Sequence, residues 1–441
     1  MKPSSHLLFM SLSLALSLGF FVPASQAADS PNIILILVDD LERGSVGCYG
    51  ANQATPNIDQ LANTGVRYET AWSMPVCTPN RVTLLTGQYP FRHGWTQHYD
   101  VAQLGGQGLS WQRFTTMAKL LREGGYETAI GGHWQINDLG KQPDALNQHG
   151  FQEYCVWADS APKENKNDTR ERHTRLLVNG KLEKTLNRAG RINSFLIDFA
   201  TRNRNQPFFI YYPMLLESVP PSESKNTKTL QPLEQINLQA TRIARMDQLI
   251  GNLINAIDVS GQQKETMILL TGTNISTVEN RILEDENEQA KSRASDHSVR
   301  VPLIVHGPAV VSGGRVSRDL VDFTDFYPTL LELAGLRTPD QLSLDGKSLV
   351  PSLRGSENPY QKRSWIYSQV GDIRMIRDWE HLIDTSGNFH NLLKDPLQQN
   401  EVSPLDKIAP GRRQRLQMLM DRLPEDADSP FPEYTQHHSN K

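Results

Sequence analysis

Short apolar runs alternate with amphipathic segments along most of this chain. The run NIILILVDD (32–40) is almost continuously apolar and ends in two aspartates, which is typical of a strand buried on both faces of a sheet. Similar runs lie at 126–132, 207–215, 265–273 and 300–308. Between them, apolar residues recur every three or four positions, as in amphipathic helices, for example at Ile192, Phe195, Leu196 and Phe199, and at Ile243, Met246, Ile250, Leu253 and Ile257. This alternation predicts an α/β fold with a mixed, mostly parallel sheet flanked by helices.

The pattern changes after PSLRGSENPYQKR (351–363), where the runs become the shorter SWIYSQV, IRMIRD and EHLIDT. We expect an α/β domain over residues 28–355. A small C-terminal subdomain with an antiparallel sheet, a terminal helix and a polar tail is expected over 356–441. The tail from residue 424 is predicted to be mobile. Three polar stretches, 158–190, 218–232 and 277–298, are predicted to be surface loops near strand ends.

The first residues have the pattern of a targeting segment. Lys2 precedes a long apolar run, and the small residues of ASQA (24–27) follow it, which predicts a secretory signal over 1–27 and a periplasmic or secreted protein. No later run is long and apolar enough to span a bilayer. The 441 residues carry a net charge of −4, which argues against nucleic acid or an anionic membrane as the main partner.

Polar side chains stand where predicted strands end. Asp39 and Asp40 close the first run, and Asn274 follows the run at 265–273. Ligands of α/β sheets bind beyond the carboxyl ends of the strands. The aspartate pair is either a solvated strand end or half of a site for a hard cation such as Ca²⁺ or Mg²⁺, which prefers oxygen ligands.

The chain has three cysteines, Cys48, Cys77 and Cys155, and an odd number in an exported protein leaves at least one without an intramolecular partner. Cys77 lies in MPVCTPNRVTLLTG, just before a predicted helix. Taken alone, it fits a packed cysteine, half of a disulfide, a nucleophile or the precursor of a modified residue. With Pro79 and Arg81 it forms the spacing C-x-P-x-R.

Around this motif the chain resembles the type I sulfatase family, and matching segments follow in order along nearly the whole mature chain. They are NIILILVDD, GCYG (47–50), TPNIDQLANTGVRYETAW (55–72), VCTPNRVTLLTGQYPFRHG (76–94), GYETAIGGHW (125–134), PFFIYYPMLL (207–216), RVPLIVHGP (300–308), DFYPTLLELAG (325–335), DGKSLVPSL and NLLKDPLQQNEVS (391–403). The resemblance implies an alkaline phosphatase/sulfatase-like fold, with the catalytic domain over 28–355.

The resemblance also implies that Cys77 is a precursor. A maturation enzyme would oxidise it to formylglycine, an aldehyde whose hydrate attacks the sulfur of a sulfate ester. Arg81 would hold this hydrate, because a guanidinium binds oxygens in a fixed fork geometry. One divalent cation per chain, Ca²⁺, would bind to Asp39, Asp40, Cys77 and Asn274 and would polarise the sulfate.

The match to the family breaks at four positions. Thr273 stands where the family has a metal-binding aspartate, and His133 replaces a sulfate-binding lysine. Gln135 and Ser218 replace two histidines and are expected to bind substrate, whereas Lys291 matches a catalytic lysine of the family. Glutamine cannot accept a proton, and the loss of a general base typically costs about 10²–10⁴-fold in rate. His133 is expected to take over part of this role.

Two functions from different classes remain. The first is a secreted sulfatase that hydrolyses a sulfate ester on a sulfated carbohydrate, with a rearranged pocket. The alternative is a catalytically impaired protein of the same fold that binds sulfated glycans without efficient hydrolysis. A phosphatase or phosphodiesterase is disfavoured, because these enzymes use a Thr or Ser nucleophile in place of the intact C-x-P-x-R. The retained motif favours the sulfatase.

Overall fold

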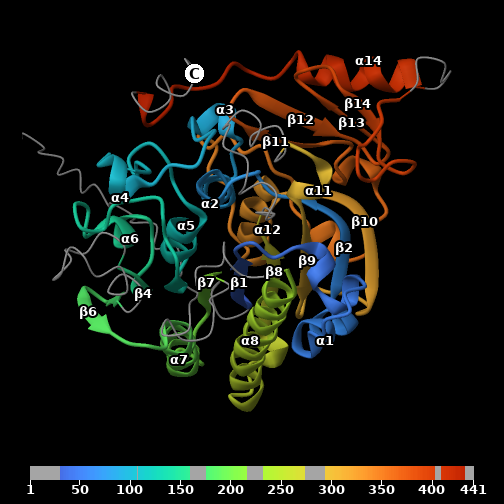
Figure 1. The fold of residues 1–441 in the computed structure, drawn as a ribbon. Coiled ribbons are helices and arrows are strands. Elements are labelled where there is room, and N and C mark those ends of the chain that lie inside the picture. The colour runs from blue at the N-terminus through green and yellow to red at the C-terminus, as the bar shows by residue number, and fades with distance from the viewer. Residues whose placement is uncertain are drawn as a thin grey trace, which may run out of the picture.

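The computed structural model describes residues 30–106, 108–158, 175–215, 232–273, 294–402 and 409–432. Within them, ten strands form one sheet in the order β10-β2-β9-β8-β1-β7-β3-β4-β5-β6 (Figure 1). The strands are β1 Asn32–Val38, β2 Val66–Trp72, β3 Glu127–Gly132, β4 Glu153–Trp157, β5 Arg175–Val178, β6 Lys181–Lys184, β7 Phe208–Met214, β8 Thr266–Gly272, β9 Arg300–His306 and β10 Arg315–Asp322.

The sheet is mixed but mostly parallel in its centre. β1 runs parallel to β7 on one side and to β8 on the other, and β3 is parallel to β7 and β4. β9 is antiparallel to both β2 and β8, while β5 is antiparallel to β4 and β6. The seven residues of β1 are all buried, as expected for a strand that is covered on both faces.

Helices cover both faces of the sheet (Figure 1). Side chains of α2, α5 and α12 share one core cluster with alternate residues of β1, and those of α1, α7 and α8 share a second cluster with the other residues of β1. The helices are α1 Pro56–Thr64, α2 Cys77–Thr86, α3 Pro90–His93, α4 Val101–Leu104, α5 Met117–Glu123, α6 Ala145–Gln148, α7 Arg188–Arg202, α8 Pro232–Val259, α11 Asp296–Val299, α12 Phe326–Leu333, α13 Val350–Leu353 and α14 Ala409–Met420.

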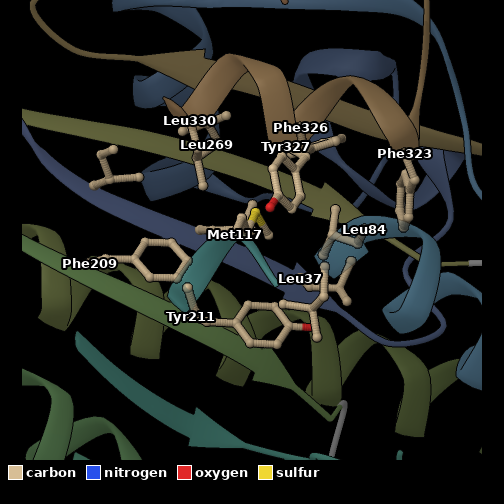
Figure 2. Packing of buried hydrophobic residues seen from close by; sticks show 14 of the residues in the cluster. Leu37, Leu84, Met117, Phe209, Tyr211, Leu269, Phe323, Phe326, Tyr327 and Leu330 are labelled. Atoms are coloured by element: carbon tan, nitrogen blue, oxygen red, sulfur yellow. The ribbon is translucent and has the colours of Figure 1, made fainter. Parts of the chain in front are cut away.

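Figure 2 shows the first of these cores. Leu37 of β1 and Tyr211 of β7 lie opposite Leu84 of α2, with Met117 of α5 and Tyr327 of α12 close by. Each fully buried aliphatic or aromatic side chain contributes roughly 1.5–3 kcal/mol relative to an exposed one. This packing therefore fixes α2, which carries the C-x-P-x-R motif, against the sheet.

A second, smaller sheet is antiparallel and has the order β11-β12-β13-β14 in the described residues. Its strands are β11 Ile366–Val370, β12 Ile373–Arg377, β13 His381–Asp384 and β14 Phe389–Asn391, and α14 packs against β12 and β13. The predicted fold class is confirmed. The domain boundaries at 27/28 and 355/356 stay predictions.

Two expectations about polar segments were wrong where the structure describes them. Residues 175–184 form the hairpin β5–β6 rather than a loop, and Asp296, in the charged stretch 277–298, is buried against Trp72 and Arg377. The tail also differs from the prediction of a mobile segment. Within residues 424–432, Phe431 is 8% exposed and packs into the core. No helix among the described residues is long and apolar enough to cross a membrane.

A buried ionic network joins the two sheets. Arg363, just before β11, donates to both carboxylate oxygens of Asp325 at 2.7 and 2.9 Å and to the hydroxyls of Thr324 and Tyr89. Asp322 at the end of β10 accepts from Tyr89 and lies 3.4 Å from Arg363. Burial raises the pKa of Asp325 to about 7, although the Arg363 charge opposes this shift. The buried carboxylates of Asp322 and Asp325 are therefore tolerated in the interior only because the Arg363 guanidinium compensates their charge.

We predict that Arg363→Met lowers the free energy of unfolding by about 3–5 kcal/mol at pH 8, because it leaves buried carboxylates without their cation. Without Arg363, the pKa of Asp325 in the folded state rises further above its unfolded value. The extra penalty relative to the wild type is therefore small while Asp325 is protonated in both folded proteins, and it grows as pH rises above the wild-type folded pKa of about 7 towards the higher folded pKa of the variant. Thermal melts at pH 5 and pH 8 should show a wider gap from the wild type at pH 8.

A suitable control is Arg202→Met, which removes a half-exposed pair with Glu153 and Asp198. Exposed pairs contribute up to about 1 kcal/mol, so this variant should stay close to the wild type at both pH values. Equal melting temperatures for Arg363→Met and Arg202→Met would contradict the role of the network.

Candidate functional site

The site begins where β1 and β8 end side by side. The backbone N–H of Asp39 donates to the Met214 carbonyl of β7, and that of Thr273 donates to the Val38 carbonyl. Asp40 has a left-handed backbone (φ 56°), and its N–H donates to the Thr273 hydroxyl at 3.1 Å. Thr273, which is predicted to stand in place of an aspartate of the family, therefore holds the ends of β1 and β8 together through these hydrogen bonds.

A buried ion pair connects β1 to α2. Nη2 of Arg81 lies 2.7 Å from Oδ2 of Asp39, with side-chain exposures of 0% and 4%. Nε of Arg81 donates to the His133 carbonyl at 3.2 Å, and Nη1 donates to the Cys77 carbonyl at 3.3 Å. Burial disfavours the charged guanidinium, but Asp39 outweighs this effect and holds the pKa of Arg81 above its ordinary value. Arg81 thus joins three candidate site segments.

Cys77 is the first residue of α2 and is half-buried. The turn before it is held by Asn80, whose side chain accepts from the Met74 N–H at 2.5 Å and donates to the Met74 carbonyl at 2.9 Å. Asn80 and Arg81 are fully buried, so both side chains help to fix the position of this turn. Asn80 thus has a structural role here.

His133 and Gln135 lie beyond the end of β3. Gly132 precedes them with φ 138°, and a Cβ there would lie 2.0 Å from the Pro213 carbonyl of β7, so only glycine fits. The His133 N–H donates to the same carbonyl at 3.0 Å. Gln135 is the centre of a three-residue turn with φ 65°, a conformation that costs roughly 1–3 kcal/mol in non-glycine residues. Strained backbone of this kind is common at functional sites.

A pocket of about 210 Å³ lies next to these residues. Its lining includes His98, Asp100, Asn137 and Trp157 together with His133, Trp134 and Gln135. The Trp157 ring lies 5.0 Å from the His133 ring, and the Arg188 guanidinium lies 3.4 Å from the Trp157 ring centre. The pocket is thus small, largely polar and partly aromatic, which suits a hydroxylated ring better than an apolar ligand.

Two other polar side chains, those of Tyr211 and His93, are buried in the core. The Tyr211 hydroxyl of β7 is buried, lies in the field of Arg81 and Asp39, and has no hydrogen-bond partner among the described residues. Burial raises its pKa. His93 is buried between the Thr83 hydroxyl and the Trp95 N–H, and burial lowers its pKa to about 3, so it is neutral. Tyr211 lies in an almost continuously apolar run, so the sequence did not single it out.

The donor atoms suit a hard cation. Oδ1 of Asp39 is buried without a hydrogen-bond partner among the described residues, while Oδ2 is bound to Arg81. Asp40 brings a second carboxylate to the same strand end, and carboxylate oxygens are the ligands that Ca²⁺ prefers. Within the described residues no group of three or more His, Cys, Asp or Glu side chains is placed to hold a metal ion.

Three predicted site residues, Asn274, Ser218 and Lys291, lie outside the described residues. Of the others, Asp39, Arg81, Cys77 and His133 are linked by direct contacts, and Asp40 and Gln135 are their close neighbours in the chain. The assigned roles of all these residues remain predictions.

The three cysteines form no disulfide. Burial raises the pKa of the Cys48 and Cys155 thiols to about 12, so both stay protonated and unreactive at neutral pH. These two residues are therefore packing cysteines, in contrast to the half-exposed Cys77 at the start of α2.

We predict that Thr273→Asp strengthens Ca²⁺ binding, because it returns a carboxylate to the oxygen donors at this strand end. Without Ca²⁺ the variant should melt below the wild type, since position 273 is fully buried. With Ca²⁺ its melting temperature should rise more than that of the wild type. Thr273→Asn, similar in size but uncharged, is the control, and an equal Ca²⁺ response of the two variants in calorimetry would contradict the prediction.

The sequence of this chain is similar to those of known sulfatases. Residues 31–336 match the family model described as Sulfatase. Human arylsulfatase A is 29% identical over 395 residues, which cover 83% of this chain and 75% of that protein. Human N-acetylgalactosamine-6-sulfatase is 29% identical over 358 residues, which cover 75% of this chain and 67% of that protein.

Solved structures show the same fold. The crystal structure of Ps i-CgsB has a TM-score of 0.72 at 24% identity, covering 89% of this chain and 92% of that one. The structure of BT4656 has a TM-score of 0.64 at 18% identity, covering 93% and 99%. The family match spans most of the chain and includes the strand ends and helix that form the site. The protein therefore belongs to the sulfatase family, whose members are sulfuric ester hydrolases.

Proposed function

We propose that this protein hydrolyses a sulfate ester on a carbohydrate by means of a formylglycine made from Cys77. One observation carries the proposal: Arg81 directly contacts Asp39, the Cys77 carbonyl and the His133 carbonyl. The candidate nucleophile, cation ligand and sulfate-binding segment therefore meet around one buried guanidinium.

The carbohydrate part of the proposal rests on the relatives and on the pocket. One similar structure is Ps i-CgsB in complex with k-i-k-neocarrahexaose, and another is BT4656 with its substrate D-glucosamine-2-N,6-O-disulfate. The pocket beside His133 offers imidazole, carboxylate and amide groups and the Trp157 ring. Such a lining supplies hydrogen bonds to hydroxyls and an aromatic surface for a sugar ring.

Each described residue has a task in this scheme. Asp39 would hold the cation through Oδ1, while its Oδ2 fixes Arg81. Arg81, permanently charged, would hold the oxygens at position 77. His133 would bind a sulfate oxygen or take up a proton. When bound, the cation and the formylglycine hydroxyl supply polarisation of the sulfate and the nucleophile. Asn274 and Lys291 would complete the site, and Ser218 and Gln135 would contact substrate.

Secretion or export to the periplasm through the segment 1–27, and conversion of Cys77 by a host maturation enzyme, are parts of the same proposal. The alternative remains a glycan-binding protein with little hydrolysis. It is favoured by one specific observation, that Gln135 stands where the family has a histidine and cannot accept a proton.

We predict that Cys77→Ala abolishes sulfate release, measured by ion chromatography with N-acetylgalactosamine 6-sulfate, glucosamine 2-N,6-O-disulfate and a carrageenan hexasaccharide as trial substrates. Mass spectrometry of the wild-type peptide containing residue 77 should show the mass loss of a thiol-to-aldehyde conversion. The control is Cys48→Ala, which should keep its activity. Sulfate release by Cys77→Ala would rule out the formylglycine mechanism.

We predict that Gln135→His raises kcat, because it introduces a group that can accept a proton at a position that the proposal places near residue 77. A general base contributes about 10²–10⁴-fold, so an increase of at least tenfold is expected if its absence limits the rate. Gln135→Asn serves as the control, since asparagine tolerates the positive φ of this turn but supplies no base. An unchanged kcat in Gln135→His would mean that His133 or another group already fills the role.

A further inference from the structure

We propose that the C-terminal strap, defined as residues 424–432, is a positioning element for substrate because it holds one wall of the pocket beside His133. The wall is the segment 95–106, which contributes His98 and Asp100 to the pocket lining. The proposal rests on the proposed function in one respect, namely that this pocket receives the sulfated sugar.

One end of the strap is fixed to the second sheet and to α3. The Asp426 carboxylate accepts hydrogen bonds from Arg374 at 2.7 Å and from Gln369 at 2.9 Å. The Ala427 N–H donates to the Phe91 carbonyl at 2.8 Å. The strap therefore leaves the second sheet on a defined path towards the pocket wall.

The other end of the strap is anchored by an aromatic cluster. The Phe431 ring lies 4.9 Å from the Tyr99 ring and 5.8 Å from the Trp95 ring, and all three side chains are buried. The Ser429 hydroxyl is 2.9 Å from the Tyr99 hydroxyl. The wall segment thus owes part of its packing to residues that follow the second sheet.

Two glycines make room for the strap. A Cβ at Gly94 would lie 2.1 Å from the Asp428 carbonyl, and a Cβ at Gly106 would lie 2.0 Å from Cε1 of Phe431. No residue with a Cβ fits at position 94 or 106 unless the strap moves away. The chain between these glycines is the wall itself, so both of its ends are shaped to receive the strap.

The wall is also linked to the start of α2. The Tyr99 N–H donates to the Thr78 hydroxyl at 3.0 Å, and that hydroxyl donates to the Gln97 carbonyl at 3.2 Å. Thr78 is buried and follows the cysteine of the C-x-P-x-R motif. His98 and Asp100 flank Tyr99, so their position relative to residue 77 depends on Tyr99, and the Tyr99 ring packs against Phe431.

The test is Phe431→Ala in the full chain. We expect hydrogen exchange of residues 95–106 to become about tenfold faster, with no change in β11–β13, because the local packing of the wall is lost. With N-acetylgalactosamine 6-sulfate as the probe, KM should rise about 5–30-fold while kcat stays within about threefold, as for a lost binding contact. Unchanged exchange in residues 95–106 would overturn the proposal.

The matched control is Met420→Ala, which truncates a side chain of similar burial in α14 that packs against the second sheet. It should leave both the exchange of 95–106 and KM unchanged, and an equal effect of the two variants would also overturn the proposal. Gly106→Ala should reproduce the effect of Phe431→Ala. The double variant should be no worse than either single one, because the clash disappears with the ring.

The hydrogen-exchange measurement and the kinetic measurement together distinguish a failure of this proposal from a failure of the proposed function. If the wild type does not hydrolyse the probe, the assumed substrate fails, and the exchange experiment still decides whether the strap orders the wall. If exchange responds as expected but KM does not, the strap holds the wall without positioning substrate, and the proposal is wrong.

Discussion

The buried ion pair of Arg81 and Asp39 is the interaction on which the site depends. It joins the carboxyl end of the central strand β1 to the first turns of α2, with both side chains almost inaccessible to water. Removing one member of such a pair leaves an uncompensated charge in the interior, at a cost of about 3–5 kcal/mol. The same carboxylate faces a cation with its other oxygen in the proposed mechanism. In this proposal the two oxygens of Asp39 have separate tasks, one structural and one chemical, so we expect a substitution of Asp39 to disturb both.

The departures from the family pattern have different physical meanings. Thr273 has taken a structural role, since its hydroxyl receives the Asp40 N–H and keeps the two strand ends together. Gln135 is the departure that we expect to affect the proposed chemistry most directly, because it occupies a strained turn at the edge of the pocket but cannot accept a proton. Among the described residues the framework of the proposed site is thus in place, and the departure at Gln135 is expected to affect proton transfer.

Much of the architecture was predictable from sequence. Continuous apolar runs such as NIILILVDD mark buried parallel strands, and the C-x-P-x-R spacing marks the start of α2. The sequence could not show that Asp296 is buried, because its charged neighbours suggest a loop and its partners Trp72 and Arg377 are far away in the chain. Tyr211 has the pattern of an ordinary core residue in the sequence for a similar reason. Their surroundings are created by tertiary contacts, and no local pattern reports these. The docking of Phe431 was missed because a polar tail carries no periodic signal.

The central position of β1 has a consequence for biosynthesis. Its first residue, Asn32, bonds to Phe208 and Thr266, which lie 176 and 234 positions further along the chain. A nascent polypeptide must therefore carry an uncovered, strongly apolar β-segment until more than half of its length has emerged from the ribosome. Non-local pairing of this kind slows folding and leaves strand edges open to association with other chains. Expression yield should depend on chaperone capacity, and fragments that end before β8 should aggregate instead of folding.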